Sequence, residues 1–231
     1  MITYYQLKVK SKSSKITTLS NLNNLPTTAM YTLPINSSNI AFFREKCYNL
    51  TEYCDWRACI MLHIYTGNGK GKTTAAVGLA VRAAGADKSV TFIQFLKSGT
   101  SSEIEQLKKL GIAVACAESC NKFTSAMNAE ELAALTEEHN TLLRRAGKLI
   151  HDGKTDMLIL DEFIGAYNME LLDTVLAEKL IADALAAGCE LVLTGRDAPQ
   201  TLCSTADYIT EMLPHKHPYD RGIPARKGIE F

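Results

Sequence analysis

The sequence has no basic surplus, no long apolar run and no closely paired cysteines, and each absence excludes a class of protein. Its 25 lysines and arginines are balanced by 25 aspartates and glutamates, so it lacks the overall positive charge typical of nucleic-acid-binding proteins. No apolar run approaches the roughly 18 to 20 residues of a membrane-spanning helix, and the N-terminus lacks the apolar core of a secretory signal. We therefore expect a small-molecule partner, with neither nucleic acid nor membrane.

Cysteine usage points to a reducing compartment. The seven cysteines are scattered, and none belongs to a Cys-x-x-Cys pair, so a disulfide framework is not expected. Cys47, Cys54 and Cys59 lack cysteine or histidine partners at zinc-finger spacing, which favours free thiols over a metal site. With 46% hydrophobic and 22% charged residues, the composition is that of an ordinary globular protein, expected in the cytoplasm.

The first 60 residues differ from the rest in charge and composition. Residues 1–46 carry six basic side chains against Glu45 alone, which leaves 19 basic and 24 acidic residues, a charge of −5, in residues 47–231. The segment is rich in Ser, Thr and Asn without sustained periodicity, so burial is not expected to offset its ordering entropy. We expect 1–60 to be a mostly disordered extension and 61–231, beginning at Met61, to be the complete functional domain. A transit peptide and a partner-binding arm stay open for the extension.

From residue 61 onward, short apolar runs alternate with helical segments. We expect strands at 61–65, 90–96, 112–117, 157–161, 190–195 and 207–212, and near-continuous apolar strands separated by helices predict a parallel sheet covered on both faces. Residues 171–185 show the apolar periodicity of an amphipathic helix, and Gly188 just after them is suited to a left-handed helix cap. The core face of a long amphipathic helix is predicted from a stripe at three- and four-residue steps, namely Leu132, Leu135, Leu142, Leu143, Ala146, Leu149 and Ile150.

The most specific motif is a glycine loop between the first of these strands and an alanine-rich helix. Such a loop turns successive N–H groups inward, and the helix N-terminus adds its dipole, which together form a nest for a polyphosphate. Lys72 supplies a positive charge, and the Thr73 hydroxyl supplies a hard oxygen for Mg²⁺. Thr66 replaces the first glycine of the usual G-x-x-x-x-G-K-[ST] pattern, with Gly67 directly after it. The expected nucleotide-binding residues of the loop are Thr66, Gly67, Asn68, Gly69, Lys70, Gly71, Lys72, Thr73 and Thr74.

A second motif is the apolar strand that ends in Asp161 and Glu162. The carboxyl ends of parallel strands meet at one edge of the sheet, so these carboxylates are expected beside the glycine loop. One of them can hold Mg²⁺ directly or through water. The residues thus predict a nucleotide with Mg²⁺ or Mn²⁺, but not the use to which it is put.

Residues 61–231 resemble the ATP:corrinoid adenosyltransferases in several segments taken together. These are "YTGNGKGKTTAAVGLAVRAAG", "VTFIQFLKSG", "LILDEF", "ELVLTGRDAP", "ADYITEM" and "KHPYDRGIPARKGIEF". The resemblance implies a P-loop NTPase fold of the RecA-like type. It also implies a reaction in which the cobalt of a Co(I) corrinoid attacks the 5′ carbon of ATP and triphosphate leaves, in adenosylcobalamin synthesis or corrinoid salvage. The cob(I)yrinic acid a,c-diamide adenosyltransferase type, a homodimer and a flavoprotein reductase as electron donor are further implications.

The resemblance assigns roles residue by residue. It implies that Lys72 binds phosphate, that Thr73 and Glu162, rather than Asp161, hold the metal, and that Arg82 lies near the nucleotide. Arg196 in "TGR" either adds positive charge near phosphate or corrin, or caps the next turn at the surface. The polar tail either covers the corrinoid or is simply solvated; its cationic and titratable residues are His215, Lys216, His217, Arg221, Arg226 and Lys227.

One segment departs from the family pattern. Members often carry "GFTW", whose two aromatics pack under the corrin, whereas this chain has "NKFTS", with Phe123 retained and Ser125 in place of tryptophan. Phe123 is the expected corrinoid contact, although a packed loop residue is the alternative. The single tryptophan, Trp56, lies outside the matched region, and Phe95 or Tyr167 could supply the second aromatic.

Two other functions would use the same nucleotide site. A RecA-like or kinase-like hydrolase would position water against the γ-phosphate with Glu162 and sense that phosphate with Arg196. A corrinoid-binding module switched by ATP would bind both ligands without turnover. The released product separates these alternatives, since triphosphate indicates attack at the 5′ carbon and ADP with phosphate indicates hydrolysis.

Overall fold

The computed structural model describes residues 8–9, 17–18, 60–120 and 122–230, and the chain divides into two units, 1–49 and 50–231. In the first unit, the two-residue strands β1 (Lys8–Val9) and β2 (Thr17–Thr18) pair antiparallel. Apart from residue 60, the rest of the predicted extension, with Trp56 and its three cysteines, lies outside the described residues, and its disorder stays a prediction.

The second unit is built on a six-stranded parallel sheet in the order β5-β4-β6-β7-β3-β8. Its strands confirm the expected parallel α/β fold, each beginning and ending within two residues of the predicted position. They are β3 (Leu62–Thr66), β4 (Val90–Gln94), β5 (Ala113–Cys116), β6 (Met157–Asp161), β7 (Glu190–Thr194) and β8 (Tyr208–Glu211). Strand β6 runs between β4 and β7, with Ile159 opposite both Phe92 and Val192.

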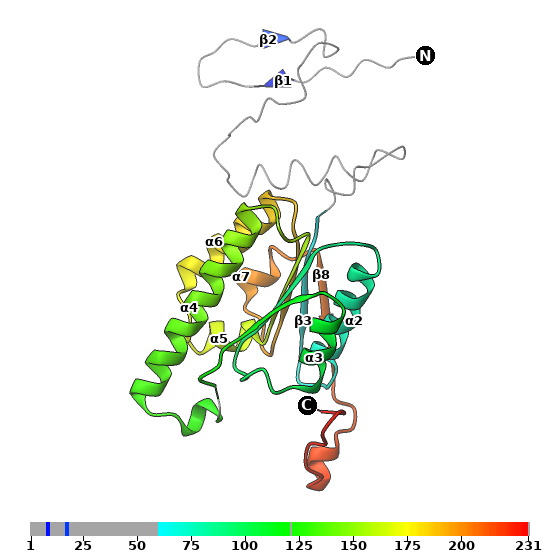
Figure 1. Ribbon diagram of the computed structural model, residues 1–231, viewed down its shortest axis with the longest axis vertical. Helices are drawn as coiled ribbons and strands as arrows, with labels where there is room; N and C mark the ends of the chain where they lie inside the picture. The colour runs from blue at the N-terminus through cyan, green and yellow to red at the C-terminus, as the bar shows by residue number, and fades with distance from the viewer. Residues whose placement is uncertain (1–7, 10–16, 19–59, 121, 231) are drawn as a thin grey trace. The chain divides into compact units, whose positions relative to one another are not determined.

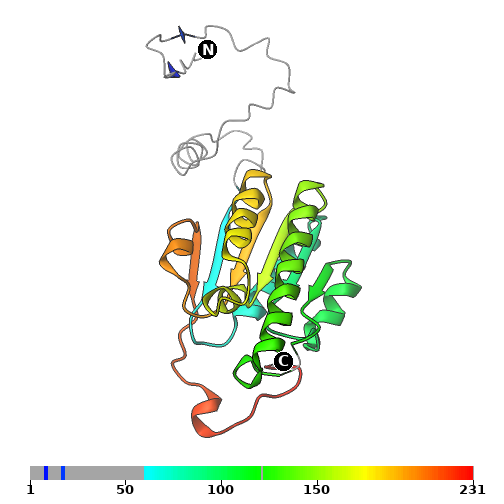
Figure 2. The same ribbon diagram turned by 90° about the vertical axis from the view of Figure 1, so that its left-hand side faces the viewer.

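Helices cover both faces of this sheet (Figures 1 and 2). On one face lie α2 (Lys72–Ala84) and α3 (Ser102–Lys109). On the other lie α4 (Ala129–His151), α5 (Phe163–Asn168), α6 (Thr174–Ala186) and the short α7 (Gln200–Cys203). Two single turns of 3₁₀-helix, η2 (Thr124–Ala126) and η3 (Pro218–Arg221), complete the unit. None of the helices in the described ranges is long and apolar enough to cross a membrane.

The sheet separates two hydrophobic cores because successive strand residues face opposite sides. On β6, Leu158 and Leu160 belong to the larger core under α4 and α6, whereas Met157 and Ile159 belong to the smaller core under α2. Helix α2 approaches the sheet through the small side chains of Ala76, Ala80 and Ala83, which are buried there.

Helix α4 has the length and stripe that the sequence predicts. It begins at a capping box, in which the Asn128 side chain accepts from the Glu131 N–H and the Glu131 carboxylate accepts from the Asn128 N–H. Of the predicted stripe, Leu135, Leu142, Leu143, Ala146 and Ile150 are buried, whereas Leu132 and Leu149 are half-buried. The buried face also contains His139, a polar residue that the apolar stripe did not include. Beyond α6, Gly188 has φ +76°, which agrees with the predicted left-handed position.

Candidate functional site

The glycine loop joins the end of β3 to the start of α2 and rests on the chain that follows β8. The Gly69 N–H donates to the Met212 carbonyl at 2.7 Å, and a Cβ on either Gly67 or Gly69 would lie 2.6 Å from that oxygen. Gly67 and Gly71 have φ of +96° and +120°, conformations that side chains rarely adopt. The loop glycines are therefore required both by backbone conformation and by close packing against β8.

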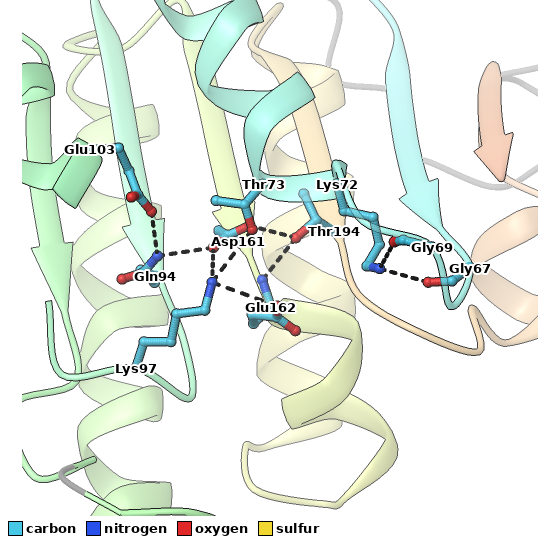
Figure 3. Close-up of polar contacts among 10 residues, drawn as sticks. All are labelled: Gly67, Gly69, Lys72, Thr73, Gln94, Lys97, Glu103, Asp161, Glu162 and Thr194. Atoms are coloured by element: carbon cyan, nitrogen blue, oxygen red, sulfur yellow. Dashed lines mark hydrogen bonds and ion pairs between the residues drawn. The ribbon is translucent and has the colours of Figure 1, made fainter. Parts of the chain in front are cut away.

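Lys72 is folded onto this loop. Its Nζ lies 2.6 Å from the Gly67 carbonyl oxygen and 2.9 Å from that of Gly69, and the side chain is buried (Figure 3). Burial lowers the pKa of the Lys72 ammonium; Glu162 opposes this effect and Arg196 adds to it. No side chain caps the N-terminus of α2 at Gly71, so the helix end and the ammonium together offer an anion site.

Asp161 is the centre of the polar contacts at the carboxyl edge of the sheet. It is fully buried and accepts from four groups on four elements (Figure 3). Its Oδ1 accepts from the hydroxyls of Thr73 and Thr194, both at 2.8 Å. Its Oδ2 accepts from the Gln94 amide at 3.0 Å and from the Lys97 ammonium at 3.1 Å. The carboxylate thus links α2, β7, β4 and the turn after β4.

Glu162 lies beside this centre but points to a different partner. Its backbone has φ +57°, and its N–H donates to the Thr194 hydroxyl at 2.9 Å, which turns the chain from β6 into α5. Its carboxylate lies 3.6 Å from Lys97 and is partly exposed. Burial would lower the pKa of Lys97, but Asp161 and Glu162 outweigh that effect and raise it.

The oxygen groups at this edge fit a magnesium or manganese ion that is also held by substrate. The Thr73 hydroxyl and the two carboxylates are hard oxygen donors of the kind Mg²⁺ prefers. Among the described residues, no group of three or more His, Cys, Asp or Glu side chains could hold a metal ion alone. Mg²⁺ commonly completes its shell with waters and phosphate oxygens, so the donor set matches a nucleotide-bound ion.

A cavity of about 910 Å³ opens in front of the glycine loop. Its wall includes Lys70, Thr73 and Thr74 of the loop region, Lys97, the segment of Phe123, and residues 228–230 of the C-terminal tail. Phe123 is 86% exposed, so it is not a packed loop residue. One continuous space therefore joins the end of the glycine loop and the start of α2 to an exposed aromatic side chain.

Several known proteins are similar in sequence to this chain. Residues 59–231 match the family model described as ATP:corrinoid adenosyltransferase BtuR/CobO/CobP. Corrinoid adenosyltransferase CobA of Salmonella typhimurium is 33% identical over 172 residues, which cover 73% of this chain and 84% of the relative. The corrinoid adenosyltransferases of Escherichia coli K12 and Pseudomonas aeruginosa are 31% and 32% identical, over 73% and 77% of this chain and 84% and 85% of theirs.

The chain belongs to the ATP:corrinoid adenosyltransferase family. Adenosyl transfer from ATP to a corrinoid, in cobalamin synthesis, is therefore its function.

The two arginines expected near the nucleotide are placed differently in this adenosyltransferase. Arg196 follows β7 at the carboxyl edge of the sheet, close enough to Lys72 to contribute to the lowering of its pKa. Arg82 lies in the last turn of α2, ten residues beyond Lys72, which is about 15 Å along the helix axis. The structure therefore brings Arg196 toward the loop and does not bring Arg82 there.

Of the two expected substitutes for the missing tryptophan, Phe95 is wrong, and Tyr167 lies outside the cavity wall. Phe95 is fully buried, with its ring 5.7 Å from that of Phe163, and cannot face the cavity. The Tyr167 hydroxyl donates to Glu178 at 2.8 Å, and Tyr167 is not part of the cavity wall. Phe123 is thus the aromatic side chain that the described residues present to the cavity.

The C-terminal tail reaches the cavity through residues that the charge pattern did not highlight. Gly228, Ile229 and Glu230 line it, held by a turn in which Arg226 Nη2 lies 3.0 Å from Glu230 Oε1. Of the six expected cationic and titratable residues, Lys216, His217 and Arg226 instead line a neighbouring cavity of about 300 Å³, beside Lys70.

Sequence reasoning missed Gln94, Lys97 and Thr194, although all three contact Asp161. The available signal was positional, because each lies at or just after the carboxyl end of a predicted parallel strand.

Proposed function

We propose that the chain transfers the 5′-deoxyadenosyl group of ATP to the cobalt of a Co(I) corrinoid. In this proposal the triphosphate is held by the glycine loop and by the residues around Asp161 at the carboxyl edge of the sheet. In this step the cobalt electron pair forms the Co–C5′ bond while the C5′–O5′ bond breaks. The oxygen keeps its electron pair and leaves as triphosphate, and the cobalt is formally oxidised from Co(I) to Co(III). The single observation that carries the proposal is the cavity shared by Thr73 and Phe123.

Each residue has a role that its position supports. Lys72 and the loop N–H groups stabilise the charge that accumulates on the departing triphosphate. Thr73 and Glu162 hold Mg²⁺ or Mn²⁺, with Asp161 orienting the Thr73 hydroxyl. The bound ion supplies positive charge to the leaving group. Phe123 contacts the corrin, and Arg196 contributes charge near the phosphates.

The resemblance alone supports four finer statements. We therefore also propose that the protein is a homodimer, that a flavoprotein reductase is its electron donor, that it is cytoplasmic, and that its activity is of the cob(I)yrinic acid a,c-diamide type. Sedimentation tests the first, and activity coupled to a flavoprotein reductase tests the second. Cell fractionation tests the third, and comparison of cobyrinic acid a,c-diamide with cobinamide and cobalamin as acceptors tests the fourth.

The direct test is anaerobic turnover of the full chain. The protein is mixed with MgATP and chemically reduced cob(I)alamin, the visible spectrum is followed, and the released polyphosphate is identified. We expect an adenosylcobalamin spectrum with stoichiometric triphosphate, and its loss in Lys72→Met but not in the exposed-surface control Lys179→Met. ADP and phosphate would indicate a hydrolase or kinase, and binding of both ligands without turnover would indicate a switched binding module.

A further inference from the structure

Lys97 lies among the oxygen groups assigned above to the metal ion. Its Nζ is 3.1 Å from Asp161 Oδ2, 3.6 Å from Glu162 Oε1 and 3.4 Å from the Thr73 hydroxyl (Figure 3). An ammonium and a divalent cation compete for the same carboxylates, because each is stabilised by the same negative charge. The lysine and the metal ion therefore cannot both make these contacts fully.

The turn that carries Lys97 is held in an unusual conformation. Leu96 has φ +54°, a left-handed conformation that is costly for a branched side chain. On one side of it, the Phe95 N–H donates to the Asp161 carbonyl at 2.9 Å. The N–H of Leu96 itself donates to Nε2 of the buried His139 at 3.4 Å. These contacts direct the chain after β4 back toward the end of β6.

His139 is oriented for this contact by a second hydrogen bond. Its Nδ1 lies 2.7 Å from the Leu171 carbonyl oxygen, so Nδ1 carries the proton and Nε2 is free to accept from Leu96. The ring also packs edge-on against Phe95, with 5.1 Å between centroids. The turn before Lys97 is thus held by His139 of α4 and by Phe95, the residue that follows β4.

Lys97 is the charged partner of Asp161. Of the four groups that donate to this fully buried carboxylate, three are neutral, and Lys97 is the one cation among the described residues that contacts it. A buried carboxylate without a nearby positive charge is strongly destabilising. Lys97 therefore supplies the countercharge beside Asp161 when no metal ion is bound.

We propose that Lys97 is an internal countercation, which holds the metal-binding oxygens in place before nucleotide binding and yields them to the divalent ion that arrives with ATP. This inference rests on the proposed function. The Lys97 side chain is 33% exposed and lines the same cavity as Thr73 and Thr74, so the displaced ammonium has room to move toward bound polyphosphate. Lys97 thus opposes the binding of free metal and favours the binding of metal with nucleotide.

The test measures Mn²⁺ binding to the full chain without nucleotide, by the electron paramagnetic resonance signal of free Mn²⁺. We compare wild type with Lys97→Met, Lys97→Arg and a matched control, Lys108→Met, which removes an exposed lysine paired with Glu105. Lys97→Met should bind Mn²⁺ about tenfold more tightly, since loss of one nearby cation of this kind is worth roughly a decade in affinity. Lys97→Arg and Lys108→Met should stay within about twofold of wild type.

Thermal unfolding gives a second readout. Without metal, Lys97→Met should unfold at a lower temperature than wild type, and saturating Mn²⁺ should raise its midpoint more than that of wild type. If Lys97→Met does not fold without metal, Lys97→Gln, which keeps a hydrogen-bond donor without charge, takes its place. Refolding of either variant only when Mn²⁺ is present would support the inference, and failure of both with saturating Mn²⁺ would overturn it.

The outcomes separate this inference from the proposed function. If wild type makes adenosylcobalamin and triphosphate but Lys97→Met binds Mn²⁺ no more tightly than wild type, Lys97 is not a countercation and the proposed function stands. If no variant binds Mn²⁺ and wild type releases no triphosphate, the metal site and the proposed function fail together.

Discussion

The Thr73 hydroxyl donates to Asp161 Oδ1 at 2.8 Å, which joins the glycine loop to the carboxyl end of β6. Residues that are 88 positions apart in the chain thereby form one site. Asp161 is fully buried, whereas Glu162 next to it is partly exposed and directed at Lys97. The two adjacent carboxylates should therefore differ in what their loss does to the protein.

Replacement of Asp161 should affect both folding and catalysis. Asp161→Asn removes a buried charge that balances Lys97, so we expect the free energy of unfolding to fall by about 3 kcal/mol, together with loss of turnover. Glu162→Gln should abolish most turnover while changing the free energy of unfolding by less than about 1 kcal/mol. Denaturant titration and the adenosylation assay measure the two effects. Equal stability losses in both variants would contradict the different roles.

Gly69 in the loop and Gly78 in α2 provide a matched pair. Gly69→Ala would place a Cβ 2.6 Å from the Met212 carbonyl oxygen, so we expect it to destabilise the fold by about 1 to 3 kcal/mol and to raise KM for ATP. Gly78→Ala lies on α2, where nothing is within 4 Å of the new Cβ, and should stabilise the helix by about 0.5 to 1 kcal/mol. A harmless Gly69→Ala would show that the chain following β8 does not constrain the loop.

Phe123 should affect binding of the corrinoid and should not affect the stability of the fold. Its ring is 86% exposed, so Phe123→Ala should leave the thermal midpoint unchanged while raising KM for the corrinoid and not for ATP. Phe163→Ala, which truncates a fully buried ring, should instead cost about 3 to 5 kcal/mol of stability. Ser125→Trp restores the second aromatic of the family pattern, although Lys122 still stands where the family has glycine, and it should lower KM for the corrinoid. A Phe123→Ala variant with unaltered kinetics would remove this residue from the site.

The stability of the fold should depend on pH through His139. Burial lowers the pKa of His139, so the unfolded chain takes up a proton before the folded chain does. The free energy of unfolding should therefore decrease as pH falls below about 6.5, the ordinary pKa of histidine, and level off below the lower folded value. Denaturant titration from pH 7.5 to 5 should show a smaller decrease in His139→Gln. An unchanged slope would assign the effect to another group.

Much of the fold follows from local sequence patterns. The apolar runs from residue 62 to residue 211 predict the strands because a parallel strand buried on both faces needs apolar side chains throughout. The glycine loop and the Asp161–Glu162 pair are also local, so their meeting at one sheet edge follows from topology.

The contacts between distant residues could not be predicted in the same way. In the sequence, Lys97 is a polar residue after a predicted strand and nothing marks it as functional. Only the left-handed turn at Leu96 brings it to Asp161. His139 interrupts an apolar stripe, and its use as an acceptor depends on the spatial position of the turn after β4. Arg82 lies ten residues beyond Lys72 on α2, a separation from the loop that the motif did not indicate, and its proximity to the nucleotide stays a prediction.

The measurement that tests the central claim most directly is the fate of the 5′ oxygen of ATP. ATP labelled with ¹⁸O at the oxygen between C5′ and the α-phosphate is incubated anaerobically with the full chain, Mg²⁺ and cob(I)alamin, and the polyphosphate is analysed by mass spectrometry. Cleavage of the C5′–O5′ bond predicts that all of the label appears in triphosphate, in a 1:1 ratio to adenosylcobalamin. Label retained in ADP, with unlabelled phosphate released and cob(I)alamin unchanged, would contradict adenosyl transfer.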